Sequence, residues 1–359
     1  MQKFLHALNS AEGMNYQALS LLWRHFCDWR YTWEQATYSE FIAAGLTAQL
    51  TEKICSGRKI FDVERSFADL WASDIFVIDR GHMEFPPLLA RIHDPPFLLY
   101  RKGAPLDCTS RHIAIVGTRN STTYGEKFTR ELAEAIALQG GIVVSGLAFG
   151  IDAMAHFGAV TQKKPTVAVL ASGLLEVTPR SHRSLADKIL SESGTLISEY
   201  PPGKPAYPGN FLARNRIISG ISVATIVTEA GLRSGALTTA ARALEQNRDI
   251  YALPGDITRS QAQGCLRLIA EGAYPIVSID NVLEQLGFKK RSASSASFTI
   301  EEHLIMQQLL QNPASTDDLL AKTGMALQNI LLSLSSLELK GVISKNKAFL
   351  WEAADFGHE

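Results

Sequence analysis

Apolar and polar residues alternate along the middle of the chain in a way that predicts an α/β domain. Between residues 111 and 255, short β-branched apolar runs are separated by segments whose apolar residues recur at helical spacing. Such alternation predicts a mostly parallel sheet with helices on both faces. We expect strands at 113–116, 142–145, 166–170, 195–198, 223–227 and 249–253, and helices from Tyr124 past Ile136 and at 152–161, 181–192, 213–219 and 235–246.

The flanking segments follow different patterns. Residues 1–75 predict short helices with a break at Gly45, and 85–103, with its two proline pairs, predicts an ordered, extended lead-in to the sheet. The basic, small-residue stretch 289–297 is typical of a linker. Beyond it, three apolar-periodic segments and a short strand-like run follow the order of a winged helix. The expected parts are therefore 1–75, 76–287, a linker at 288–299, and 300–359.

Each terminal part allows two interpretations. A helix–Gly–helix turn like that at Gly45 occurs in small nucleic-acid-binding modules, but small helical domains are more often packing units, which we favour. In the tail, the third helical segment is rich in leucine and poor in basic residues. DNA-binding winged helices usually present a basic recognition helix. We therefore expect the tail to contact protein or a second subunit rather than DNA.

Composition narrows the class of protein. The 359 residues are 46% hydrophobic and 20% charged, which suits a large folded core. The four cysteines form no C-x-x-C pair, no signal-peptide pattern is present, and no apolar run reaches the ~20 residues that span a bilayer. We expect a soluble, cytoplasmic protein without membrane contact, and the scattered histidines predict no metal site.

Charge is unevenly distributed. The net charge is −1, but residues 111–255 hold 15 basic and 11 acidic side chains, whereas acidic residues outnumber basic ones on both sides. Several of the central arginines fall in predicted loops. This pattern favours a local anion-binding surface over general binding to polyanions.

The loop after the first predicted strand, IAIVGTRNSTTYG at 113–125, begins like a phosphate-binding loop. Its glycines fit neither G-x-G-x-x-G nor G-x-x-x-x-G-K-[ST], so no dinucleotide or ATP cofactor is expected. Backbone amides at Gly117 and Thr118 and the guanidinium of Arg119 nevertheless suit a phosphate.

Three further loops are expected at the same edge, because ligands of open parallel sheets bind outside the carboxyl ends of the strands. They are SGLAFGID at 145–152, TPRSHR at 178–183, and NFLARNR at 210–216. A mixture of arginines with an aromatic ring is typical of single-stranded nucleic acid sites. The candidate DNA-binding residues are Gly117, Thr118, Arg119, Ser145, Gly146, Gly150, Arg180, Phe211, Arg214, Asn215 and Arg216.

Other readings of single residues stay open. Gly146 and Gly150 can be simple turn glycines, and Arg183 and Arg216 can be surface ion-pair partners. His156, on a helix face, is expected to be a structural hydrogen-bonding group rather than a catalyst. The convergence of four loops is what favours a site.

The order of motifs resembles the DNA-processing protein A family, DprA or Smf, over about residues 85–285. The resemblance rests on FPPLLARIHDPPFLLYRKG, VGTRNSTTYG, SGLAFGIDAMAH, EYPPG, FLARNRIISGIS, TEAGLRSGALTTAARALEQNRDIYALPG and GCLRLIAEGA, which follow one another in that order. It implies an extended Rossmann-like domain at 76–287, with a helical module of SAM or helix–hairpin–helix type before it and a winged-helix-like domain after it.

The resemblance also implies a function. Members bind single-stranded DNA without catalysis, protect it during natural transformation (competence), and load a RecA-type recombinase, generally as homodimers through the central domain. By motif match, Arg119 is the DNA-contacting arginine of G-[ST]-R, and Phe211, Arg214 and Arg216 lie in F-x-x-R-N-R. Leu212 and Leu266 depart from the family's proline and asparagine, which puts the rigidity of the first loop and any role of the second in doubt.

Two hypotheses follow. In the first, Arg119, Arg180, Arg214 and Arg216 hold phosphates while Phe211 stacks a base, so that log K falls against log salt with a slope of roughly −3. In the second, the chain is a nucleotide-cleaving phosphoribohydrolase, an enzyme family marked by P-G-G-x-G-T-x-x-E. The corresponding stretch, 228–240, has Glu229 but lacks the glycine pair. We favour the first, with Asp152, Glu229, Ser234 and Gly235 as structural turn residues.

Overall fold

The computed structural model describes residues 1–288, 299–339, 342–346 and 350–353. The chain forms two compact units, 1–289 and 290–359. The linker expected at 288–299 falls almost wholly outside the described residues.

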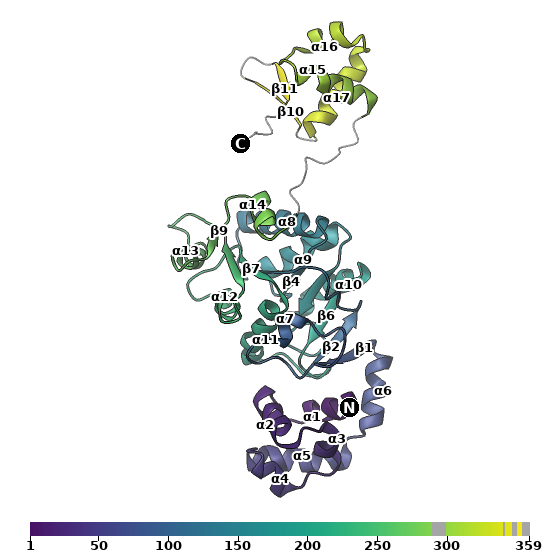
Figure 1. Ribbon diagram of the computed structural model, residues 1–359, viewed down its shortest axis with the longest axis vertical. Helices are drawn as coiled ribbons and strands as arrows, with labels where there is room; N and C mark the ends of the chain where they lie inside the picture. The colour runs from purple at the N-terminus through teal and green to yellow at the C-terminus, as the bar shows by residue number, and fades with distance from the viewer. Residues whose placement is uncertain (289–298, 340–341, 347–349, 354–359) are drawn as a thin grey trace. The chain divides into compact units, whose positions relative to one another are not determined.

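A nine-stranded sheet organises the first unit (Figure 1). Its strand order is β1-β2-β6-β5-β4-β3-β7-β8-β9. Every neighbouring pair from β6 through β5, β4, β3, β7 and β8 to β9 is parallel. At one edge, β2 pairs antiparallel with β6, and β1 pairs antiparallel with β2. The strands are β1 Ile75–Asp79, β2 Leu98–Gly103, β3 His112–Val116, β4 Ile142–Ser145, β5 Thr166–Val169, β6 Thr195–Ser198, β7 Ala224–Val227, β8 Asp249–Ala252 and β9 Tyr274–Pro275.

Helices cover both faces of this sheet because its central strands are apolar on both sides. In β3, Ile113 and Ile115 pack in a cluster with α8, α9 and α14, whereas Ala114 and Val116 pack in a second cluster with α7, α11 and α12. The helices are α7 Pro87–Ala90, α8 Thr123–Leu138, α9 Ile151–Thr161, the 3-10 turn η1 Arg180–His182, α10 Arg183–Ser191, α11 Pro208–Ile221, α12 Gly235–Glu245, α13 Gln263–Ala270 and α14 Ile279–Gln285.

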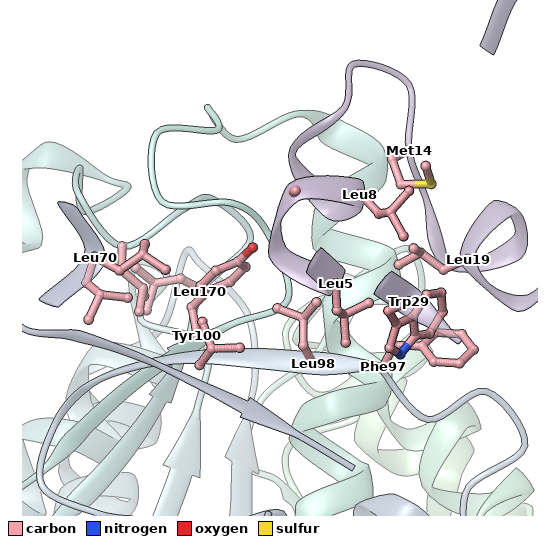
Figure 2. Packing of buried hydrophobic residues seen from close by; sticks show 14 of the residues in the cluster. Leu5, Leu8, Met14, Leu19, Trp29, Leu70, Phe97, Leu98, Tyr100 and Leu170 are labelled. Carbon is pink, nitrogen blue, oxygen red and sulfur yellow. The ribbon is translucent and has the colours of Figure 1, made fainter. Parts of the chain in front are cut away.

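The N-terminal helices share a hydrophobic core with the sheet. Figure 2 shows Leu5 of α1 beside Leu98 of β2, in the cluster that also contains Leu8 and Tyr100. The Tyr100 hydroxyl lies 2.8 Å from Nδ1 of His6. Burial raises the pKa of the Tyr100 phenol and lowers the pKa of His6 to about 4. These helices are α1 Gln2–Ser10, α2 Tyr16–Phe26, α3 Trp29–Glu34, α4 Tyr38–Ala43, α5 Ala48–Ile60 and α6 Val63–Ala72. In this structure they are a packing unit of the sheet.

The second unit is a winged-helix fold. Helices α15 Ile300–Leu309, α16 Thr316–Thr323 and α17 Leu327–Leu339 precede the antiparallel strands β10 Ile343–Lys345 and β11 Trp351–Ala353. Capping boxes formed by Thr299 with Glu302 and by Ser315 with Asp318 start the first two helices. Ile305, Leu319, Ile330 and Trp351 meet in its core.

The predicted α/β class, with helices before the sheet and a winged helix after it, is confirmed, and the six expected strands lie within one residue of their positions. The expectation for 85–103 was incomplete, because the segment forms the helical turn α7 and the strand β2. Helix α11 starts at Pro208, five residues before the expected position, where proline suits the first helical turn. Strand β1 was not predicted.

Candidate nucleic-acid interface

A pocket of about 380 Å³ lies beyond the carboxyl ends of β3, β4 and β7. Its charged lining consists of three arginines and one aspartate, so the pocket is positively charged. The lining residues are Val116, Gly117, Thr118, Arg119, Ala148, Asp152, Arg214, Asn215, Ile218, Gly231, Arg233, Ser234, Gly235, Ala236 and Thr239. The structure therefore brings together three of the four predicted loops, joined by the turn before α12.

Arg119 is an exposed cation at the rim of this pocket. Its guanidinium carbon lies 5.1 Å from the centre of the half-buried Phe211 ring, a cation–π distance. The loop beneath is held closely, because the Thr118 amide donates to the Glu229 carbonyl at 2.7 Å. A Cβ at Gly117 would stand 2.5 Å from Ile151, so only glycine allows this approach.

The loop at 145–152 is organised around the buried carboxylate of Asp152. This group accepts hydrogen bonds from the amides of Gly146 at 3.1 Å and Ala148 at 3.4 Å. Burial raises the pKa of Asp152, and the charge of Arg214 together with the two amide bonds opposes that rise. Ser145 is buried and donates to the Ile115 carbonyl at 2.6 Å, so its hydroxyl is used inside the sheet.

Arg214 lines the pocket, but its side chain is buried and hydrogen-bonded to the protein backbone. The residue is 4% exposed, and its guanidinium donates to the carbonyls of Gly146, at 2.8 Å, and Val169. Burial lowers the pKa of Arg214 to about 10, and Asp152 counteracts this. A Cβ at Gly146 would meet this guanidinium at 2.5 Å. Arg214 thus ties three loops together.

Arg216 lies outside the pocket. Its guanidinium is 4% exposed and forms ion pairs with Asp94 at 3.2 Å and Glu199 at 2.6 Å. It also stands 5.6 Å from the ring of Tyr16 on α2. With both carboxylates in place, Arg216 has no side available to a phosphate. We therefore remove it from the interface expected from the sequence.

Arg180 also lies apart from Arg119. It lines a different cavity of about 480 Å³, together with Lys102 and Arg183. Its ion pair with Glu176, at 3.3 Å, is strongly exposed on both sides and hence weak. Arg180 therefore remains accessible to an anion, but not in the same pocket.

The turn before α12 carries an arginine that we did not single out from the sequence. Arg233 is exposed and lines the same pocket as Arg119. Ser234 caps the helix by accepting from the Ala236 amide at 3.3 Å, and Gly235 begins it. The placement of an arginine between Gly231 and Gly235, in a strand-to-helix turn, was the available signal.

Asn215 connects this turn to α11. Its Nδ2 donates to Thr238 Oγ1 at 3.0 Å, and its Oδ1 accepts from Arg214 Nε at 3.2 Å. These contacts fix the amide's orientation inside the pocket wall.

Glu229 is held in a tight hydrogen-bonded turn and does not line the pocket. Its carboxylate accepts from the Thr122 amide at 2.8 Å and from the Thr122 hydroxyl at 2.5 Å. The side chain is 7% exposed and its atoms would collide with a Cβ at Gly125. A group held in this way is poorly placed as the general acid or base that the hydrolase hypothesis needs.

Two features are absent from the described residues. No cluster of three histidine, cysteine or acidic side chains is arranged to hold a metal ion there. Within the same residues, no helix has the length and apolar character needed to cross a bilayer. His156 is buried, with Nδ1 2.9 Å from Thr166 Oγ1 on β5.

Comparisons with known proteins match both units. The sequence profile of the family described as DNA recombination-mediator protein A matches residues 76–287, and that of the DprA winged helix domain matches 289–346. The chain is 35% identical to Protein Smf of Escherichia coli over 84% of this chain and 83% of that protein. It is 41% identical to DNA processing protein DprA of Bacillus subtilis over 59% of this chain and 71% of that protein.

Two solved structures resemble this one. DNA processing protein A from Streptococcus pneumoniae superposes with a TM-score of 0.67 at 30% identity, covering 79% of this chain and 98% of that one. The protein from Helicobacter pylori, solved to describe its single-stranded DNA binding mode, gives a TM-score of 0.52 at 29% identity, with coverage of 59% and 95%. The first profile spans more than half of the chain, and the motifs it covers are those that build the pocket, so this chain belongs to the DprA/Smf family of DNA recombination mediators.

Proposed function

We propose that this recombination mediator binds single-stranded DNA, without sequence specificity, in the pocket lined by Arg119 and Arg233. The observation that carries the proposal is the combination of two exposed guanidinium groups with an aromatic ring at the carboxyl edge of a parallel sheet. Phosphates would neutralise the guanidinium groups, and a base would stack on the half-buried ring of Phe211. The H. pylori relative, described as binding single-stranded DNA, supports the same ligand.

The shape of the site favours unpaired strands over duplex. The two cations lie in a concave pocket of about 380 Å³ rather than on a flat or convex surface. A base has to leave its stack to reach the Phe211 ring beside Arg119, and this costs little in a single strand but a few kcal/mol in a duplex. Contacts to phosphates and ring faces carry no base identity, so all sequences are bound alike.

The buried positions of Arg214 and Arg216 change the expected salt dependence. We count three exposed arginines as phosphate contacts, namely Arg119 and Arg233 at the pocket and Arg180 in the second cavity. At about 0.7 per neutralised phosphate, the slope of log K against log salt is about −2 rather than −3. A slope measured by fluorescence anisotropy with oligo-dT checks this number.

The central experiment is a mobility-shift titration with single- and double-stranded oligonucleotides. Wild-type protein is expected to retain the single strand preferentially, and Arg119→Ala to weaken binding to every sequence while flattening the salt slope. Arg130→Ala is a matched control, because Arg130 is an exposed arginine on α8 that pairs with Glu134 at 3.0 Å. Equal affinities of wild type and Arg119→Ala would contradict the proposal.

Bound strands would be protected and passed to a RecA-type recombinase during DNA uptake. Membership of a family of recombination mediators supports a recombinase partner. The expected result is that the protein accelerates recombinase assembly on DNA coated with single-strand-binding protein, measured as the recombinase's ATPase activity. Arg119→Ala is expected to lose this acceleration, and absence of any acceleration by wild type argues against loading.

We further propose that the central domain forms a homodimer through the groove between α12 and α13. This groove, of about 610 Å³, contains the exposed side chains of Leu232, Leu244 and Tyr274 and lies at the sheet edge formed by the two-residue strand β9. Exposed apolar side chains beside an open sheet edge are a surface that a second copy can cover. Sedimentation should give a dimer for wild type and a monomer for Leu244→Glu.

A further inference from the structure

An aromatic side chain next to the pocket has no role in the contacts described so far. Phe149 lies in the loop between β4 and α9 and is 48% exposed, although large apolar side chains are usually buried. Its neighbour Ala148 lines the pocket. On the other side, Gly150 approaches the Arg119 loop so closely that a Cβ there would stand 2.4 Å from the Thr118 carbonyl. The backbone that carries the ring is therefore adjacent to the loop of the proposed phosphate contacts.

The backbone that carries Phe149 is held in an unfavourable conformation. Leu147, two residues earlier, has a φ of 56°, in the left-handed region that a bulky apolar residue rarely adopts. The five other non-glycine residues with positive φ in the described part of the chain all follow the end of a helix, where this conformation is common. Leu147 instead precedes a helix. Gly150 adds a second positive φ, of 72°.

Several contacts hold this conformation in place. Asp152 accepts the amides of Gly146 and Ala148, Leu147 is fully buried, and Nδ1 of His182 donates to the Leu147 carbonyl at 2.9 Å. Strained backbone of this kind persists where the surrounding structure enforces it, and it is concentrated at functional sites. Here its result is that a ring is kept at the surface rather than in the core.

The ring of His182 supports that of Phe149. The two ring centres are 4.7 Å apart with planes inclined at 65°, an edge-to-face arrangement. Because His182 is itself anchored to the Leu147 carbonyl, the pair forms a fixed aromatic surface that joins the 145–152 loop to the segment carrying Arg180 and Arg183. A fixed exposed ring loses little entropy when a partner stacks on it.

We propose that Phe149, positioned by His182, is a second base-stacking surface, which binds a nucleobase of the same single strand whose phosphates contact Arg119. The proposal rests on the proposed single-stranded DNA binding and extends the path of the strand from Phe211 across the 145–152 loop. Every base has a π-face, so this contact adds affinity without selecting a sequence. Phe149 touches the ligand, whereas His182 acts through Phe149.

The test compares two ligands of equal length, oligo-dT and an abasic deoxyribose-phosphate oligomer. Both offer the same phosphates, but only the first offers bases. Phe149→Ala is expected to weaken oligo-dT binding about 5- to 150-fold, the range measured for loss of one stacked base, and to leave binding of the abasic oligomer and the salt slope unchanged. Phe149→Tyr, which keeps the ring, should bind oligo-dT as wild type does.

Further variants distinguish stacking from loop damage. His182→Ala should lower the preference for oligo-dT over the abasic oligomer by less than Phe149→Ala does, because the ring remains but loses its support. Trp71→Ala removes an aromatic side chain that is 64% exposed on α6 and should change neither ligand's affinity. Equal weakening of both ligands by Phe149→Ala would mean that the ring only shapes the loop, and would overturn the proposal.

The outcomes also separate this proposal from the one it rests on. If wild type fails to bind oligo-dT at low salt, single-stranded DNA binding itself is wrong. If wild type binds and Phe149→Ala binds equally well, DNA binding stands and the second stacking surface does not.

Discussion

Two groups of arginines, both near the carboxyl edge of the sheet, perform opposite tasks. Arg119 and Arg233 are exposed at the pocket rim, whereas Arg214 and Arg216, on the single helix α11, are each 4% exposed and occupied by protein carbonyls or carboxylates. The guanidinium group suits both settings, because it donates in a planar fork and keeps its charge on burial. What differs is whether carbonyl or carboxylate groups of the protein surround the guanidinium. The buried pair completes the scaffold, and the exposed pair is left for a ligand.

The largest expected effect comes from the buried group. Arg216→Ala should lower the free energy of unfolding by about 3–5 kcal/mol, because it leaves the carboxylates of Asp94 and Glu199 without their partner. Denaturant unfolding measures this change. Arg242→Ala is the control, since Arg242 is an exposed arginine paired with Glu245 on α12 and should cost less than 1 kcal/mol. Equal stabilities of the two variants would contradict a structural role for the buried Arg216.

The exposed group should show the reverse behaviour. Arg233→Ala is expected to weaken single-stranded DNA binding by about 1.5–3 kcal/mol, or roughly 10- to 150-fold, with little loss of stability. The salt slope should fall by about 0.7, as expected for one phosphate contact. Titration at several salt concentrations gives both values. If Arg233→Ala is less stable than wild type but binds single-stranded DNA normally, Arg233 has a structural role like that of Arg214 and Arg216.

Lowering the pH should reduce the free energy of unfolding through the buried histidine His156, whereas the exposed arginines keep their charge. Burial lowers the pKa of His156 to about 3 in the folded protein, from an ordinary value of 6.5. Between these two pKa values His156 is protonated in the unfolded chain but neutral in the folded chain. The free energy of unfolding therefore decreases as the pH falls below 6.5 toward 3. Between pH 7 and 5 this group alone should cost about 2 kcal/mol. His156→Gln should show a shallower dependence in denaturant unfolding, and parallel curves would contradict the assignment.

The smallest expected effect concerns the winged helix. In its described residues, exposed leucines such as Leu331 and Leu332 lie on α17, the third helix of the fold. Ending the chain after Phe288 should therefore change single-stranded DNA affinity by less than about twofold. A change of this size is no larger than the effect of an ordinary surface substitution. Loss of duplex binding on this truncation would reverse our view that the tail contacts protein.

The sequence predicted the central fold well because its information is local. Runs such as 113–116 and 142–145 are β-branched and apolar on both faces, and only a covered parallel strand satisfies such a pattern. Strands β1 and β2 were missed because they pair antiparallel at the edge, next to prolines that favour several extended conformations. Their pairing joins segments separated by two pairs of prolines and a helical turn.

The candidate site was predicted less completely. The Arg119 loop and its neighbours at 145–152 and 210–216 meet as expected, since strand ends of one parallel sheet share an edge. The motif F-x-x-R-N-R by itself cannot reveal which of its arginines is buried, however, because a helix turns successive residues in different directions. Arg214 faces the strand ends, Arg216 faces Asp94 and Glu199, and Phe211 remains beside Arg119.

The order of apolar runs, turns and glycines along this chain determined by itself that a covered parallel sheet forms and that its loops gather cations at one edge. Only the tertiary structure decided which cations stay exposed, because burial depends on the carbonyls and carboxylates that distant segments place around each guanidinium. It also decided that Phe149 stands at the surface, through a strained backbone held by Asp152 and His182. Periodicity reports which face of an element is apolar, and it carries no information about partners far away in sequence.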